Sequence, residues 1–91
     1  MAQTVYMAPE RVDRLSSSSV QKELDKLLDE GVTDLVFDMT NLKYISSAGL
    51  RVLLATQQRL SGKGSITLSN IPKSVKELLD VTGFSGFIKT Q

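Results

Sequence analysis

Three short apolar segments alternate with three amphipathic segments along this chain, and that order constrains the fold more than any other feature of the sequence. Residues 4–9, 34–39 and 65–70 are rich in β-branched, aromatic or aliphatic residues, which predicts strands. The first of these ends at a proline, which favours a strand near a sheet edge. Because each predicted strand is followed by a predicted helix through a short connection, we expect an α/β fold with a mostly parallel sheet. The 91 residues are enough for a single domain, which we place over residues 1–91.

Helical spacing marks the three amphipathic segments. The first is predicted to begin within the serine run at 16–19 and to end near Glu30, with Gly31 as the terminator. The second begins at about Ser47 and is broken by residues 61–64. The third opens at Pro72 and ends at Gly83. Each predicted helix has an apolar stripe, and we expect an apolar tail after the third helix to pack on the sheet. The stripes comprise Val20, Leu24, Leu27, Leu28, Leu50, Leu53, Leu54, Val75, Leu78 and Leu79, and the tail comprises Phe84, Phe87 and Ile88.

The composition removes several classes of function. The chain has neither histidine nor cysteine, so it lacks an imidazole base, a thiolate nucleophile and the usual zinc ligands. Its net charge of +1 gives no indication of a nucleic-acid or anionic-membrane partner. No apolar run approaches the roughly 20 residues of a membrane span, and no signal peptide is evident at the start. We therefore expect a cytoplasmic protein that binds no metal, nucleic acid or membrane.

Two short motifs resemble enzyme signatures but lack residues that those signatures require. Residues 45–49, ISSAG, resemble a nucleophile elbow, but the first glycine is missing and no histidine exists to activate a serine. Residues 61–65, SGKGS, lack the Ser or Thr that follows the lysine of a phosphate-binding loop. Asp25, Asp29 and Glu30 fall on the polar face of a helix and are interpreted as solvated charges. An enzyme is thus the least favoured class.

The segment FDMTNLKYISSAGLRVLL, residues 37–54, predicts a strand, a loop and a helix that begins at two adjacent serines. Ser46 or Ser47 can cap this helix. The free amides at a helix N-terminus also suit an anion, so a phosphoryl group on Ser47 would gain about 0.3–1 kcal/mol from the helix end. It would add about −1.5 to −2 charges. Capping and phosphorylation are compatible, and the small Ala48 and Gly49 would let a partner approach the backbone.

The same residues resemble a known family. LVFDMTNLKYISSAGLRVLL looks like the signature of the STAS domain of bacterial anti-sigma factor antagonists, in which an apolar strand leads to D-[LM]-[ST] and then to [DS]-S-[SAT]-G-[LI]. ERVDRLSSSSVQKEL and ITLSNIPKSVKELLDVTGF resemble the earlier turn with its helix and the closing strand with its helix. The resemblance covers roughly residues 5–88. It implies a small STAS-like domain whose mostly parallel sheet has about four strands.

The resemblance implies that the protein works as a partner switch, in which phosphorylation controls the binding of another protein. Ser47 would be the phosphorylated residue, with Ser46 as the second choice, because Ser46 occupies a position often held by aspartate. A GHKL-type serine kinase that is itself the anti-sigma factor would use ATP to phosphorylate it, and a metal-dependent serine phosphatase would reset it. This chain would need no cofactor of its own. The unphosphorylated form would bind the kinase and release its target, such as a sigma factor.

The predicted partner interface surrounds the serine turn. Four polar residues frame the serine in the family pattern, and Leu50 and Arg51 directly follow the turn, although Leu50 also suits a core position and Arg51 a solvated one. The alternative function is a STAS docking subunit of a larger signalling or lipid-transport assembly, without regulated phosphorylation. The interface set is Asp13, Asp38, Thr40, Asn41, Ser46, Gly49, Leu50 and Arg51.

Overall fold

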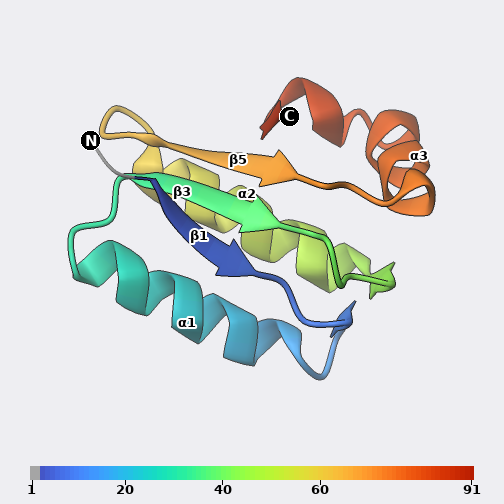
Figure 1. The fold of residues 1–91 in the computed structure, drawn as a ribbon, viewed down its shortest axis with the longest axis horizontal. Helices are drawn as coiled ribbons and strands as arrows, with labels where there is room; N and C mark the ends of the chain where they lie inside the picture. Colours follow the sequence, from blue (N-terminus) through green and yellow to red (C-terminus); the bar gives the residue numbers. More distant parts are fainter. Residues whose placement is uncertain (1–2) are drawn as a thin grey trace.

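A computed structural model describes residues 3–91 as two parallel sheets and three α-helices. The larger sheet has the order β1-β3-β5-β6, with β1 at Thr4–Met7, β3 at Asp34–Asp38, β5 at Ser65–Ser69 and β6 at Lys89–Thr90 (Figure 1). The smaller sheet pairs β2, Arg11–Val12, with β4, Tyr44–Ile45. Every strand pair is parallel. The prediction of an α/β fold with a mostly parallel sheet of about four strands is confirmed.

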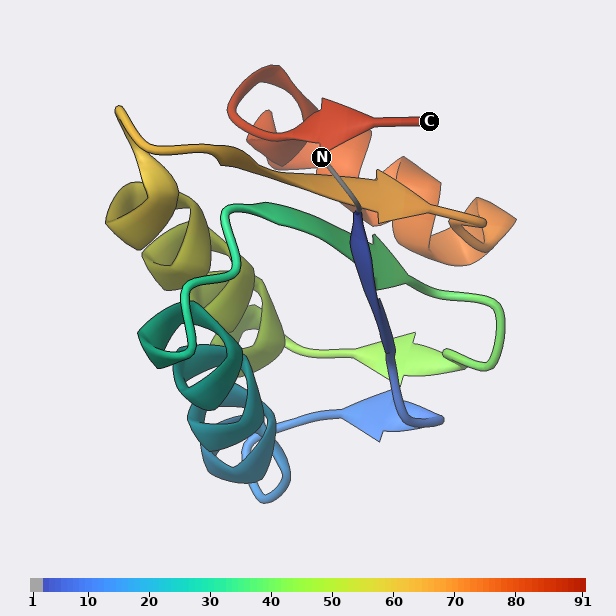
Figure 2. The same ribbon diagram turned by 60° about the vertical axis from the view of Figure 1, so that its left-hand side comes forward.

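The helices connect successive strands, as parallel pairing requires. They are α1 at Ser17–Asp29, α2 at Ser47–Leu60 and α3 at Lys73–Val81, followed by a short 3₁₀ turn, η1, at Phe84–Gly86. α1 and α2 lie side by side against one face of the larger sheet (Figure 2). Between the helices and the sheet is the core, whose largest buried side chains include Leu24, Leu35, Phe37, Leu53, Ile66, Leu68 and Leu79.

Two of the predicted helix terminators adopt the backbone conformation that favours glycine. Gly31 follows the cap residue of α1 with a φ of +100°, and Gly83 follows that of α3 with a φ of +75°. In both places the left-handed residue ends the helix and turns the chain. The predicted helix ends are therefore correct to within two residues. The first strand ends at Met7, two residues before the proline that was expected to close it.

Three strands were missed, and one side chain of the tail was misplaced. β2, β4 and β6 have two residues each, which is too short for a periodic pattern to appear in the sequence. In the tail, Ile88 is buried and Phe84 packs against the core, as expected. Phe87, however, is 66% exposed. Its amide donates to the Phe84 carbonyl and closes η1 at the surface, so only the following residue turns inward.

Within residues 3–91, no helix combines the length and the apolar character that crossing a membrane requires. The same part of the chain holds no group of three or more acidic side chains arranged to bind a metal ion.

Candidate functional site at the serine turn

The serine turn lies beside the start of α1 because the two short strands before α1 and α2 are paired. Val12 is in register with Ile45, and the Ser46 amide donates to the Val12 carbonyl at 2.9 Å. The turns that follow β2 and β4 therefore emerge at the same edge, and α1 and α2 begin next to each other (Figure 2). The carboxyl ends of parallel strands are where α/β domains commonly place their binding sites.

The structure separates the roles of the two serines. Ser46 is the N-cap of α2: its backbone is extended, and its Oγ accepts from the Gly49 amide at 3.4 Å. Ser46 is half-buried, and its Oγ also lies 3.5 Å from the Val12 carbonyl. Ser47 is the first residue of the helix and is exposed, and its hydroxyl forms no hydrogen bond within residues 3–91. Of the two capping candidates, Ser46 is thus the cap, and the hydroxyl of Ser47 is accessible.

The cap makes a testable contribution to stability. Replacing Ser46 by alanine removes the acceptor of the Gly49 amide, so we expect the free energy of unfolding to fall by about 0.5–2 kcal/mol. Replacing Ser47 by alanine removes no hydrogen bond between residues of the described chain and should change it by less than about 0.5 kcal/mol. Urea denaturation of the two variants checks this. Equal losses in both would contradict the assignment of the cap.

Gly49 serves the fold, which corrects one expectation for the small residues after the serines. Gly49 is buried, and a Cβ there would lie 2.7 Å from the Val12 carbonyl oxygen and 2.6 Å from Cγ1 of Ile45. The close approach that requires glycine is therefore made by this chain's own β2 and β4, and Gly49 itself offers no surface to a partner. Leu50 is only 9% exposed and belongs to the core, which was the alternative to the interface position predicted for it.

Asp13 organises the turn between β2 and α1. Its Oδ1 accepts from the amides of Leu15 and Ser16, each at 3.0 Å, and its Oδ2 accepts from Nε of Arg11 at 3.2 Å. The Ser16 amide and then Arg11 hold the pKa of the Asp13 carboxyl below its usual range, because both stabilise the charged form. Asp13 thus shapes the surface beside the serine turn through the backbone that it holds.

Asp38 organises the loop that follows β3, also by accepting hydrogen bonds. One carboxylate oxygen accepts from the Thr40 hydroxyl at 2.5 Å and from its amide at 2.8 Å, and the other accepts from Nδ2 of Asn70 at 3.1 Å. The Thr40 hydroxyl is the main reason that the pKa of Asp38 is lowered. Thr40 and Asn41 are exposed and line a shallow hollow with the β1–β2 connection. The sequence did not single out Asn70, whose φ of 51° is left-handed.

Arg51 lies one helical turn after Ser47. It is exposed and forms no ion pair within residues 3–91. Residues four apart are neighbours on a helix surface, and side chains lean toward the helix N-terminus. Arg51 and Ser47 are therefore neighbouring positions on the surface of α2.

Three residues beside the turn were not among the predicted site residues. Leu15 is 88% exposed, and Tyr44 is 46% exposed with the Arg11 guanidinium 4.8 Å from its ring centroid. A signal for Leu15 was present: it lies five residues before Val20, outside the spacing of the apolar stripe on α1. No signal in the sequence marked the pairing of Arg11 with Tyr44, because it depends on the β2–β4 register.

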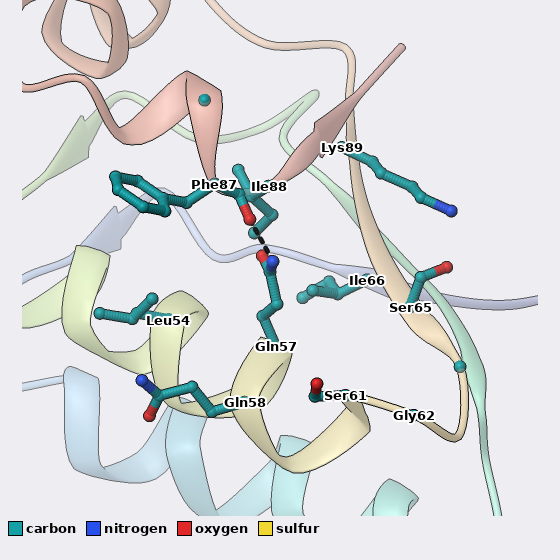
Figure 3. Close-up of a pocket in the computed structure, with 12 residues that line it drawn as sticks. Leu54, Gln57, Gln58, Ser61, Gly62, Ser65, Ile66, Phe87, Ile88 and Lys89 are labelled. Carbon is teal, nitrogen blue, oxygen red and sulfur yellow. Dashed lines mark hydrogen bonds between the residues drawn. The ribbon is translucent and has the colours of Figure 1, made fainter.

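A second hollow lies at the other end of α2 and is separate from the serine turn. It has a volume of about 590 Å³ and is lined by the end of α2, the start of β5 and the tail (Figure 3). Gln57 points from α2 toward the tail, and its Nε2 donates to the Phe87 carbonyl (Figure 3). This bond ties the tail to α2. The Gln57 Oε1 is buried without a partner in the described part of the chain.

Comparison with known proteins places this geometry in a family. The STAS domain model matches residues 2–91. BtrV of Bordetella bronchiseptica, named as an anti-sigma factor antagonist, is 35% identical over 74 residues, which cover 80% of this chain and 64% of BtrV. The match therefore spans less than two thirds of the length of that relative.

Solved structures share the fold. An anti-sigma factor antagonist from Mycobacterium paratuberculosis superposes with a TM-score of 0.88 and 16% identity, over 97% of this chain and 75% of that one. The Bacillus cell fate determinant SpoIIAA in its phosphorylated form superposes with a TM-score of 0.74 and 15% identity, over 98% of this chain and 82% of that one. At these identities the likeness establishes the fold alone.

Proposed function

Since this chain belongs to the STAS domain family, we propose that it is an anti-sigma factor antagonist in a phosphorylation-controlled partner switch. The unphosphorylated chain binds an anti-sigma factor that is a GHKL-type serine kinase, and the kinase then releases its target. Phosphorylation of Ser47 ends the binding. The observation that carries the proposal is the accessible Ser47 hydroxyl at the first position of α2, next to a different serine that caps the helix. The name of BtrV and the phosphorylated SpoIIAA support it.

The chemistry of the switch is divided between two proteins. The kinase holds ATP, and the Ser47 Oγ takes the γ-phosphoryl group while ADP leaves and the hydroxyl proton passes to a base of the kinase. This chain acts as a substrate and binding protein without catalysis and without a cofactor of its own. A metal-dependent serine phosphatase then hydrolyses the phosphoserine. All three proteins work in the cytoplasm.

The position of Ser47 suits a modification that changes binding more than folding. The phosphate would sit at the N-terminus of α2, where unpaired amides and the helix dipole favour an anion. It would disturb no side-chain hydrogen bond within the described chain, because Ser47 makes none there. The same phosphate would place about two negative charges in the middle of a contact surface. The fold tolerates this charge, whereas a docked partner does not.

Incubation with candidate serine kinases of the same genome and ATP, followed by mass spectrometry of residues 44–51, tests the proposal. We expect one phosphate on Ser47 in the wild-type chain and in Ser46→Ala, and none in Ser47→Ala. The phosphorylated chain should no longer retain the kinase in a pull-down experiment. A stable complex that never acquires phosphate would refute the switch and favour the docking-subunit function.

A further inference from the structure

A highly exposed leucine lies in the turn between β2 and α1, and hydrogen bonds fix the backbone of that turn. Leu15 is 88% exposed, and its amide donates to the Asp13 carboxylate at 3.0 Å. The Ser16 amide donates to the same oxygen, so the turn carrying Leu15 is fixed at two successive positions. A single exposed leucine is common on protein surfaces and means little by itself. Its neighbours are what give it significance.

An aromatic side chain lies next to this turn on the outer face of the smaller sheet. Val12 and Ile45 are buried, so Arg11 and Tyr44, which precede them in the two paired strands, face outward. The Arg11 guanidinium lies over the Tyr44 ring at 4.8 Å, which restrains both side chains. Tyrosine and arginine, together with tryptophan, are enriched among the residues that contribute most of the binding energy at protein interfaces.

The charges around the turn are uneven. Residues 10–15 and 38–51 contain four of the eleven basic residues and three of the ten acidic ones, whereas the rest of the chain carries seven of each. Two of these acidic residues are in ion pairs, Asp13 with Arg11 and Glu10 with Lys43, and the third, Asp38, accepts hydrogen bonds from Thr40 and Asn70. Arg14 and Arg51 are exposed and have no ion pair within residues 3–91. The surface is therefore a locally positive one.

We propose that the kinase binds a patch of basic and apolar side chains through an acidic surface with an apolar pocket that receives Leu15. This basic apolar patch consists of Arg11, Arg14, Leu15, Tyr44 and Arg51. This inference rests on the proposed function and names the chemistry of the partner's binding surface. A membrane is a poorer match, because basic segments that bind anionic lipid use clusters of about 4–8 cations. Here two cations are without an acidic partner in the described chain.

The patch also explains how the phosphate ends binding. Arg51 lies four residues after Ser47 on the same helix face, within reach of a phosphate on that serine. The phosphate would neutralise Arg51 and present its remaining charge to the acidic partner. Attraction would thus become repulsion at the centre of the interface, while Leu15 would remain in place.

Isothermal titration of the kinase with the full chain and its variants tests the patch. We expect Leu15→Ala to weaken binding about tenfold, because the variant lacks the methyl groups that the pocket of the kinase would bury. The matched control is Val81→Ala, because Val81 is 85% exposed but lies at the end of α3. We expect Arg14→Glu to weaken binding by at least about tenfold at low salt and less at high salt. Lys76→Glu on α3 is the charge-matched control and should have little effect.

The outcomes separate this inference from the proposed function. If the wild-type chain binds and is phosphorylated on Ser47, but Leu15→Ala and Arg14→Glu bind as their controls do, the patch is refuted and the switch stands. If no kinase binds or phosphorylates the wild-type chain, the proposed function fails and the inference fails with it. Co-sedimentation with phosphatidylserine vesicles that is lost in Leu15→Ala would also overturn the inference, in favour of a lipid surface. Circular dichroism confirms that each variant is folded.

Discussion

Replacing Ser47 by aspartate is expected to weaken binding of the anti-sigma kinase by about a hundredfold, with the fold intact. The carboxylate would cancel the attraction between Arg51 and the kinase and would itself lose water in the interface, which together cost several kcal/mol. About 1.4 kcal/mol corresponds to each tenfold change in affinity. The fold is spared because Ser47 is exposed and is not the cap of α2. Aspartate in the first turn of a helix even interacts favourably with the helix dipole. Isothermal titration and thermal unfolding of the same preparation measure both effects.

The matched control for this variant is Ser74→Asp. Ser74 is exposed in the first turn of α3, so the new carboxylate meets a helix N-terminus in both variants. We expect Ser74→Asp to bind the kinase as the wild-type chain does. A large fall in melting temperature for Ser47→Asp alone would show that the serine mainly supports the helix. Unchanged kinase affinity in Ser47→Asp would contradict the switch and leave the docking-subunit function.

Replacing Gly49 by alanine is expected to lower the free energy of unfolding by about 1–2 kcal/mol. The new methyl group would lie 2.6 Å from the Ile45 side chain and 2.7 Å from the Val12 carbonyl, closer than real contacts allow. Relieving such overpacking through shifts of side chains and backbone typically costs about 1–3 kcal/mol. Alanine recovers up to about 1 kcal/mol through its higher helix propensity. The clash exceeds this gain, so α2 must shift away from the β2–β4 pair.

Gly86→Ala is the control, since a Cβ there meets nothing within 4 Å and its φ is not left-handed. Without a clash, alanine restricts only the unfolded chain, so Gly86→Ala should be neutral or stabilising by up to about 1 kcal/mol. Urea denaturation of both variants measures the difference. Because the shift would also displace Ser46 and Ser47, Gly49→Ala should bind the kinase more weakly than Gly86→Ala. Equal stability of the two variants would show that the space around Gly49 adjusts freely.

Local chemistry determined much of this protein from its sequence. The apolar periodicity of α1 through Val20 and Leu24 and the glycines after α1 and α3 predicted helices that the structure confirms. The alternation of strands and helices predicted the parallel sheet. The serines before Leu50 predicted a helix N-terminus at Ser46 or Ser47. These features depend on neighbours within one or two turns of chain, so a sequence window contains them.

Only the tertiary structure decided which side chains are available to a partner. Leu50 and Gly49 follow the serines in sequence, but the core and the β2–β4 pair bury them. Leu15 and Tyr44 are separated by 29 positions in the sequence, and the pairing of β2 with β4 brings their segments together. Ser46 is the cap because its amide is anchored to Val12, across the same pairing. Such contacts arise from strand register between distant segments, and strands of two residues are too short for a hydrophobic pattern in the sequence to specify that register.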